Sequence, residues 1–311
     1  MSNSAEASKT RPQATVKEKE SGSGSGSGWF TVPAPLARLF RKFPLLTYPP
    51  NELPARSSGL RDVPTLYVFI SDEDALKGLP SFNPSCLKWQ TFLKLMGVDF
   101  RVRPSNNHAS PTGALPFLLP PSVPTDSTKS RAPIPSKKLE QYGLDWGKAK
   151  PPKDPGPKLE VYESLLDHRI RTAWLYTLYL SPANTALLTS LYVEPATSSW
   201  PVRTTILYQL RRAAELEILR STARSAVDPN ALYRGAREAF GALEALLDED
   251  QWFFGGEVPG LFDAAVFSYT YLLLHEGLAW ENRRLGDILG EFPGLVEHRD
   301  RIYQRCWGSG K

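Results

Sequence analysis

Two side chains that could act as nucleophiles stand next to each other, at Ser85 and Cys86. They follow Asn83 and Pro84, which suit the N-cap and the first position of a helix. The positive end of a helix dipole can lower the pKa of a thiol, so this turn could support thiol chemistry. A packed, unreactive cysteine is the simpler interpretation, because free cysteines are often buried. We favour this second interpretation for Cys86.

The other polar residues show no further catalytic or metal-binding pattern. Asp167 and His168 are interpreted as solvated helix positions and not as an acid–base pair. The four histidines lack the spacings of zinc-binding helices, and Cys86 and Cys306 are too far apart in sequence for a disulfide framework. Phosphate-binding loops, nucleophile elbows and carboxylate dyads are not found. We therefore expect no catalysis, no cofactor and no metal.

A candidate contact surface lies in the helix predicted for residues 35–43. Apolar residues recur there at i, i+3, i+4 and i+7, with cations on the opposite face. The apolar residues are Leu36, Leu39, Phe40 and Phe43, and the cations are Arg38, Arg41 and Lys42. An exposed face of this kind would meet a partner or an anionic membrane surface, to which each cation would contribute about 1 kcal/mol. The alternative, a helix folded back on its own core, stays open.

Composition limits the function classes. The 311 residues are 41% hydrophobic and 11% aromatic, as in a globular protein, and the formal net charge is +4. A nucleic-acid-binding protein would show a denser basic stripe, so we expect no nucleic acid. No apolar run reaches the roughly 18 residues that a membrane-spanning helix needs. The N-terminus lacks both an apolar signal core and an acid-poor presequence pattern.

The first half of the chain reads as a small α/β unit. Residues 1–28 are predicted to be a disordered tail, and residues 29–62 an N-terminal arm that contains the amphipathic helix. A buried strand is predicted at 65–70, a helix from Pro84 to a stop at Gly97, and further strands at 98–102 and 113–119. Residues 120–158 are rich in proline and lysine and are interpreted as an insert within this unit of residues 63–158.

Helical periodicity dominates the remainder, residues 159–311. Helices are predicted at about 159–180, 201–227, 229–247, 261–277, 281–289 and 292–306, with Asp228 and Pro229 as a cap and first-turn pair. An α/β unit followed by an all-helical half is therefore expected.

This order of elements resembles the glutathione transferases, which have a thioredoxin-like domain followed by an all-helical domain. Leu115-Pro116 stands where that fold keeps a proline, commonly cis, before its third strand. Residues 252–269 resemble the capped, buried helix of the helical domain. Gly260 replaces the usual Ser or Thr cap, so Asp263 has to satisfy the start of the helix alone. The resemblance implies that Pro116 and Asp263 define the fold.

More specific motifs resemble the metaxin family. Residues 159–179 are similar to the metaxin helix with a Leu-Tyr-Thr-aromatic stretch, and residues 261–274 to the motif Leu-Asp-Ala-x-Val-Phe-x-Tyr, with Phe262 in place of its leading Leu. The Trp29–Pro54 arm resembles that of the smaller fungal metaxin-like subunit of the mitochondrial sorting-and-assembly (SAM) complex. A C-terminal membrane anchor is not evident, which favours this smaller subunit over its larger partner.

The resemblance implies a non-catalytic subunit, held peripherally on the cytosolic face of the mitochondrial outer membrane. Its implied partners are a membrane β-barrel core subunit, a second metaxin-like subunit and β-barrel precursors, whose insertion it would assist. Strand pairing through its sheet edge is one conceivable mode.

Two alternatives remain open. The first is a divergent glutathione transferase or thiol enzyme that uses Cys86 or Ser85. Glu163-Ser164 matches the acidic residue and serine with which transferases hold the γ-glutamyl group, but it opens a long helix instead of following a β-hairpin, so we interpret it as coincidence. The second alternative is an adaptor with the same fold, which predicts a buried Leu36 face and other protein partners.

Overall fold

The computed structural model describes residues 63–121, 132–150, 152, 154 and 156–308. The predicted tail and arm, with the apolar face of Leu36, Leu39, Phe40 and Phe43 and the cations Arg38, Arg41 and Lys42, lie outside the described residues. Within the described part, no helix is both long enough and apolar enough to cross a membrane.

A four-stranded mixed sheet forms the first half, in the order β2-β1-β3-β4. Strand β1 (Thr65–Val68) runs parallel to β2 (Arg101–Pro104) and antiparallel to β3 (Phe117–Leu119), and β3 pairs with β4 (Ile134–Pro135). The strand predicted at 98–102 begins later, because the N–H of Val98 donates to the carbonyl of Leu93 and so belongs to the end of the preceding helix.

That helix, α3 (Pro84–Leu95), has the predicted start and stop. The side chain of Asn83 accepts a hydrogen bond from the Cys86 N–H at 3.1 Å, and the chain leaves the helix through Gly97 at a φ of +70°. Such a φ suits glycine, which has no Cβ to clash. A short helix, α2 (Asp72–Lys77), precedes α3 and was not predicted from the sequence.

The interpretation of residues 120–158 as an insert is wrong in part. The segment contains strand β4 and helix α4 (Leu139–Trp146), which complete the thioredoxin-like half. Leu139 of α4 is fully buried, and Tyr142 is largely buried. The abundant prolines and lysines of the segment hide this short amphipathic helix. Residues 122–131 lie outside the described residues.

The second half is helical. Helices α5 (Lys158–Leu165) and α6 (Arg171–Leu175) are joined and followed by π-helical turns at Leu166–Ile170 and Tyr176–Leu180, so the chain is helical from 158 to 180. The short α7 (Thr185–Leu188) and its π-helical turn Thr189–Val193 were not predicted. The helices α8 (Trp200–Thr222), α9 (Pro229–Leu247), α10 (Leu261–Leu274), α11 (Arg284–Leu289) and α12 (Pro293–Trp307) were. The Asp228 carboxylate caps α9 by accepting from the N–H groups of Asn230 and Ala231.

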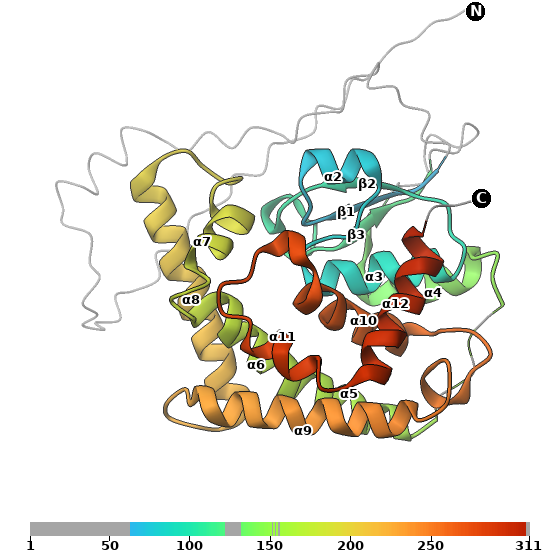
Figure 1. The fold of residues 1–311 in the computed structure, drawn as a ribbon. Helices are drawn as coiled ribbons and strands as arrows, with labels where there is room; N and C mark the ends of the chain where they lie inside the picture. The colour runs from blue at the N-terminus through green and yellow to red at the C-terminus, as the bar shows by residue number, and fades with distance from the viewer. Residues whose placement is uncertain (1–62, 122–131, 151, 153, 155, 309–311) are drawn as a thin grey trace, which may run out of the picture. The chain divides into compact units, whose positions relative to one another are not determined.

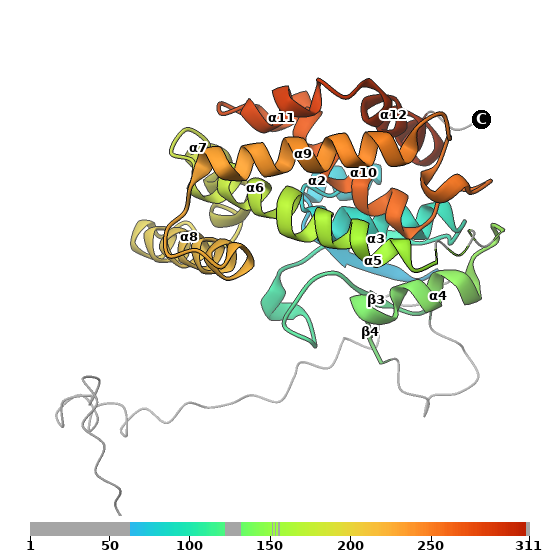
Figure 2. The same ribbon diagram turned by 90° about the horizontal axis from the view of Figure 1, so that it is seen from below.

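One hydrophobic core runs through both halves. Helix α10 is buried along almost its whole length and packs against α3 on one side and α12 on another. Figure 1 shows α3 between the sheet and α10, and in the view from below (Figure 2) α3 and α10 again lie next to each other. The fold is therefore glutathione-transferase-like, a thioredoxin-like domain followed by an all-helical domain, as predicted.

Candidate functional site

The N-terminus of α3 is where a transferase would stabilise a thiolate. Its backbone donors are largely used within the chain. Pro84 has no N–H, the N–H of Cys86 is held by the Asn83 side chain, and that of Leu87 donates to the Asn83 carbonyl at 2.8 Å. At most the N–H of Ser85 is left for an anionic ligand.

Aromatic side chains pack beside this turn. Tyr192, from the π-helical turn after α7, accepts a hydrogen bond from the Asn83 side-chain amide at 3.0 Å. Its ring lies 5.3 Å from the rings of both Phe69 and Phe82, centroid to centroid. Burial raises the pKa of Tyr192 well above its usual value, so the hydroxyl stays protonated. Tyr192, from the helical half, thus holds Asn83, the residue that caps α3, in place by a hydrogen bond.

The two candidate nucleophiles differ in their surroundings. Cys86 is fully buried, and burial raises the pKa of its thiol to about 12. The helix dipole therefore does not produce a thiolate, since the loss of hydration outweighs it. Ser85 is exposed.

We predict that native Cys86 resists alkylation by iodoacetamide at neutral pH. A thiol pKa near 12 instead of 9 lowers the thiolate fraction about a thousandfold, and burial restricts access further. Mass spectrometry of the alkylated peptides measures the rate with and without urea. The variant Ser85→Cys is a matched control, because it places a thiol one residue away at an exposed position, where fast labelling is expected. Equal rates for native and unfolded Cys86 would contradict the buried assignment.

The segment that leads into Pro116 also satisfies its own polar groups. The Leu115–Pro116 peptide bond is cis, and both residues are buried. The Leu115 N–H donates to the side-chain oxygen of Asn107 at 3.0 Å, and the Ala114 carbonyl accepts from the Ser110 hydroxyl at 2.6 Å. An extended ligand lying along this segment would have to displace these bonds.

The carboxylate expected of a γ-glutamyl site is missing from the corresponding turn. The residues that follow the β3–β4 hairpin are Ser136, Lys137 and Lys138, a short 3-10 turn with cations where transferases have an acidic residue and a serine. Glu163 and Ser164 lie instead on α5, in the helical half. Sequence inspection alone could not place this turn, because it fell within the supposed insert.

The Asp167–His168 pair is placed on the surface. Both residues are exposed on the π-helical turn after α5, and His168 Nδ1 lies 2.8 Å from the Ser221 hydroxyl. Among the described residues, no three His, Cys, Asp or Glu side chains come together as a metal site requires.

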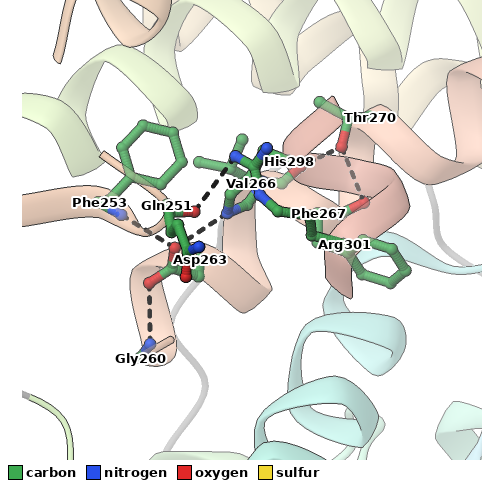
Figure 3. A network of polar contacts seen from close by, with 9 residues as sticks. All are labelled: Gln251, Phe253, Gly260, Asp263, Val266, Phe267, Thr270, His298 and Arg301. Atoms are coloured by element: carbon green, nitrogen blue, oxygen red, sulfur yellow. Dashed lines mark hydrogen bonds and ion pairs between the residues drawn. The ribbon is translucent and has the colours of Figure 1, made fainter. Parts of the chain in front are cut away.

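Asp263 forms the centre of a buried polar network at the start of α10. One carboxylate oxygen accepts the Gly260 N–H at 2.8 Å, and the other accepts the Phe253 N–H at 3.1 Å and lies 2.9 Å from His298 Nε2 (Figure 3). A carboxylate can only accept here, so Nε2 carries the proton. Glycine suits position 260, because the Cβ of any other residue would lie only 3.2 Å from Pro152 Cβ.

His298 was missed by sequence inspection. It is fully buried on α12, and among the described residues its Nδ1 has no hydrogen-bond partner. A second residue of α12, Arg301, contacts the turn before α10. It donates to the Gln251 carbonyl at 3.3 Å (Figure 3). The helical pattern of residues 292–306 marks His298 as a helix position but not as the partner of a carboxylate 35 residues away.

Comparisons with known proteins agree with this fold. A model of the glutathione S-transferase N-terminal domain matches residues 84–184, and one of the glutathione S-transferase C-terminal domain matches residues 236–302. Metaxin-1 from Homo sapiens is 27% identical over 207 residues, which cover 65% of this chain and 43% of that protein. Metaxin-1 from Macaca fascicularis is also 27% identical over 207 residues, with 65% and 63% covered. The matched region thus spans less than two thirds of either relative.

Solved glutathione S-transferases also align with this chain, at low sequence identity. A glutathione S-transferase from Ceriporiopsis subvermispora, determined in complex with glutathione, aligns with 78% of this chain and 97% of its own at 12% identity and a TM-score of 0.49. One from Methylobacterium radiotolerans aligns with 78% and 91% at 18% identity and a TM-score of 0.42. The chain thus has a glutathione-transferase-like fold and is distantly similar to metaxin-1 over 65% of its length.

Proposed function

We propose that this chain is a non-catalytic subunit of the SAM complex, which inserts β-barrel proteins into the mitochondrial outer membrane. It acts on the cytosolic face, held there by contacts with a membrane β-barrel core subunit and a second metaxin-like subunit, and it assists the recognition and assembly of β-barrel precursors. The observation that carries the proposal is the similarity to metaxin-1 over 65% of the chain.

The absence of catalysis is part of the proposal and is supported by the three positions described above. At the start of α3, Asn83 accepts hydrogen bonds from the N–H groups of Cys86 and Leu87. Before Pro116, the Leu115 N–H and the Ala114 carbonyl are bonded to Asn107 and Ser110. The turn after the hairpin offers lysines instead of an acid. A scaffold kept for its surfaces has no need for these groups, whereas a transferase depends on them.

Affinity purification from intact mitochondria tests the proposal. A tagged version of the full chain should co-purify, in fixed ratio, with an outer-membrane β-barrel protein and a second metaxin-like protein. Extraction with alkaline carbonate should release the chain, because a peripheral protein is held by contacts and not by a membrane span. Recovery of the chain in the cytosolic fraction without such partners would refute the proposal and would favour an adaptor elsewhere in the cell.

A further inference from the structure

A second surface, separate from the α3 turn, has features of a binding site. It is a groove of about 650 Å³ at the open edge of the sheet, bounded by the end of α2, strand β2 and the last turn of α12. Among the described residues, strand β2 pairs with β1 alone and is the edge strand of the sheet. We call this surface the β2 groove.

The β2 groove is lined by cations that lack acidic partners. Lys94, Arg101, Arg103 and Arg305 line it, and in the described part of the chain none of them forms an ion pair. The other two charges of the lining are neutralised: Lys77 pairs with Glu73 at 2.6 Å and Asp99 with Lys148 at 2.5 Å. The groove therefore carries an uncompensated positive charge, although the protein as a whole is only mildly basic.

Lys94 is the most constrained of these cations. Its ammonium group donates to the Cys306 carbonyl at 3.1 Å and lies 5.1 Å from the centre of the Trp307 ring. Partial burial lowers the pKa of Lys94, and among the described residues no carboxylate pairs with it. An anion in the groove would supply the missing charge.

The spacing between Arg101 and Arg103 matches the distance between alternate side chains of an extended peptide. Arg101 and Arg103 are exposed and alternate along β2, so their side chains project from the same face of the strand, about 7 Å apart. The parallel register with β1 turns the N–H and C=O of Val102, between them, toward the open edge. Pro104 has no N–H, which confines strand pairing to this short stretch. Leu76, 88% exposed, and Phe100 add apolar contacts.

We propose that the β2 groove binds an extended acidic peptide segment of a partner protein. The segment lies along β2, and carboxylates at alternate positions reach Arg101 and Arg103, while the intervening side chains face Lys94 and Arg305 from α3 and α12. A peptide suits the surface better than a flat membrane, because the charges line a concave edge at strand spacing. The proposal does not depend on the SAM assignment.

Fluorescence anisotropy with a labelled peptide of alternating Glu and Val residues tests the proposal on the full chain. We expect saturable binding that weakens as salt is raised, and much weaker binding of the same peptide with Gln in place of Glu. The double variant Arg101→Glu/Arg103→Glu should bind the acidic peptide roughly tenfold more weakly or worse, since two attractive charge pairs become repulsive. Arg305→Glu, on a different element, should weaken binding independently.

The double variant Arg220→Glu/Arg234→Glu is the matched control. It changes the net charge equally at exposed positions on α8 and α9, away from the groove, and should bind like the unmodified protein. Circular dichroism confirms that each variant is folded. Equal weakening by both double variants would mean that only net charge matters, and would overturn the proposal. So would failure of the acidic peptide to bind while anionic phospholipid vesicles bind in a manner that depends on Arg101 and Arg103.

Discussion

Replacing Asp263 by alanine is expected to lower the free energy of unfolding by about 3–5 kcal/mol, because it removes a buried acceptor that serves three donors. The residue is 2% exposed, and its carboxylate accepts from the N–H groups of Phe253 and Gly260 and contacts His298 Nε2. Without it these donors stay buried and unpaired. The start of α10, α12 and the turn at Phe253 then lose the acceptor that they share. Urea denaturation followed by circular dichroism measures the change.

Asp228→Ala is the comparison for this experiment. Asp228 also caps a helix through two backbone N–H groups, but it is exposed, so water can replace it and a loss of about 1 kcal/mol is expected. Similar losses for the two variants would mean that Asp263 acts only as a helix cap and that its bonds to Phe253 and His298 contribute little.

Phe267→Ala is expected to cost about 3–5 kcal/mol as well, through a cavity at the junction of the two halves. Phe267 is fully buried on α10, and its ring stacks on those of Tyr271, 5.3 Å away, and Trp307, 5.6 Å away. Because α10 packs against α3, the cavity weakens the core that both halves share. Both halves should still unfold in one transition, at a lower urea concentration.

Two probes separate the halves in this experiment. Trp89 reports on α3 and Trp280 on the helical half. Phe267→Leu keeps most of the volume and should cost less than about 1.5 kcal/mol. If Trp89 and Trp280 report separate transitions in the unmodified protein, the halves do not share one core and the expectation fails.

Local signals in the sequence were sufficient where one segment decides its own structure. The helix at Pro84 has a cap, a first-turn proline and a glycine stop within the same stretch, so its bounds were predicted closely. The same holds for α9, with Asp228 and Pro229 at its start. Strand β1 was evident because a strand buried on both faces is continuously apolar.

Local signals failed where the structure of a segment depends on contacts with residues distant in sequence. Helix α4 is short and lies within a segment that is otherwise rich in lysine and proline, and it packs against α3, which is distant in sequence. The candidate site could be located from sequence, at Ser85, Cys86 and Pro116. The sequence could not show that polar groups at this site are bonded within the chain. Tyr192 contacts Asn83, 109 residues away in sequence, and His298 contacts Asp263, 35 residues away. Periodicity within a segment does not indicate contacts of this kind.

We infer that the chain's own groups fill the place where a transferase would hold glutathione. Isothermal titration calorimetry with reduced glutathione tests it most directly, with an active glutathione transferase measured alongside. We expect no saturable heat up to millimolar ligand for the unmodified protein, and the same result for Ser85→Ala. Saturable binding that Ser85→Ala weakens would show that the site at the start of α3 is open to glutathione.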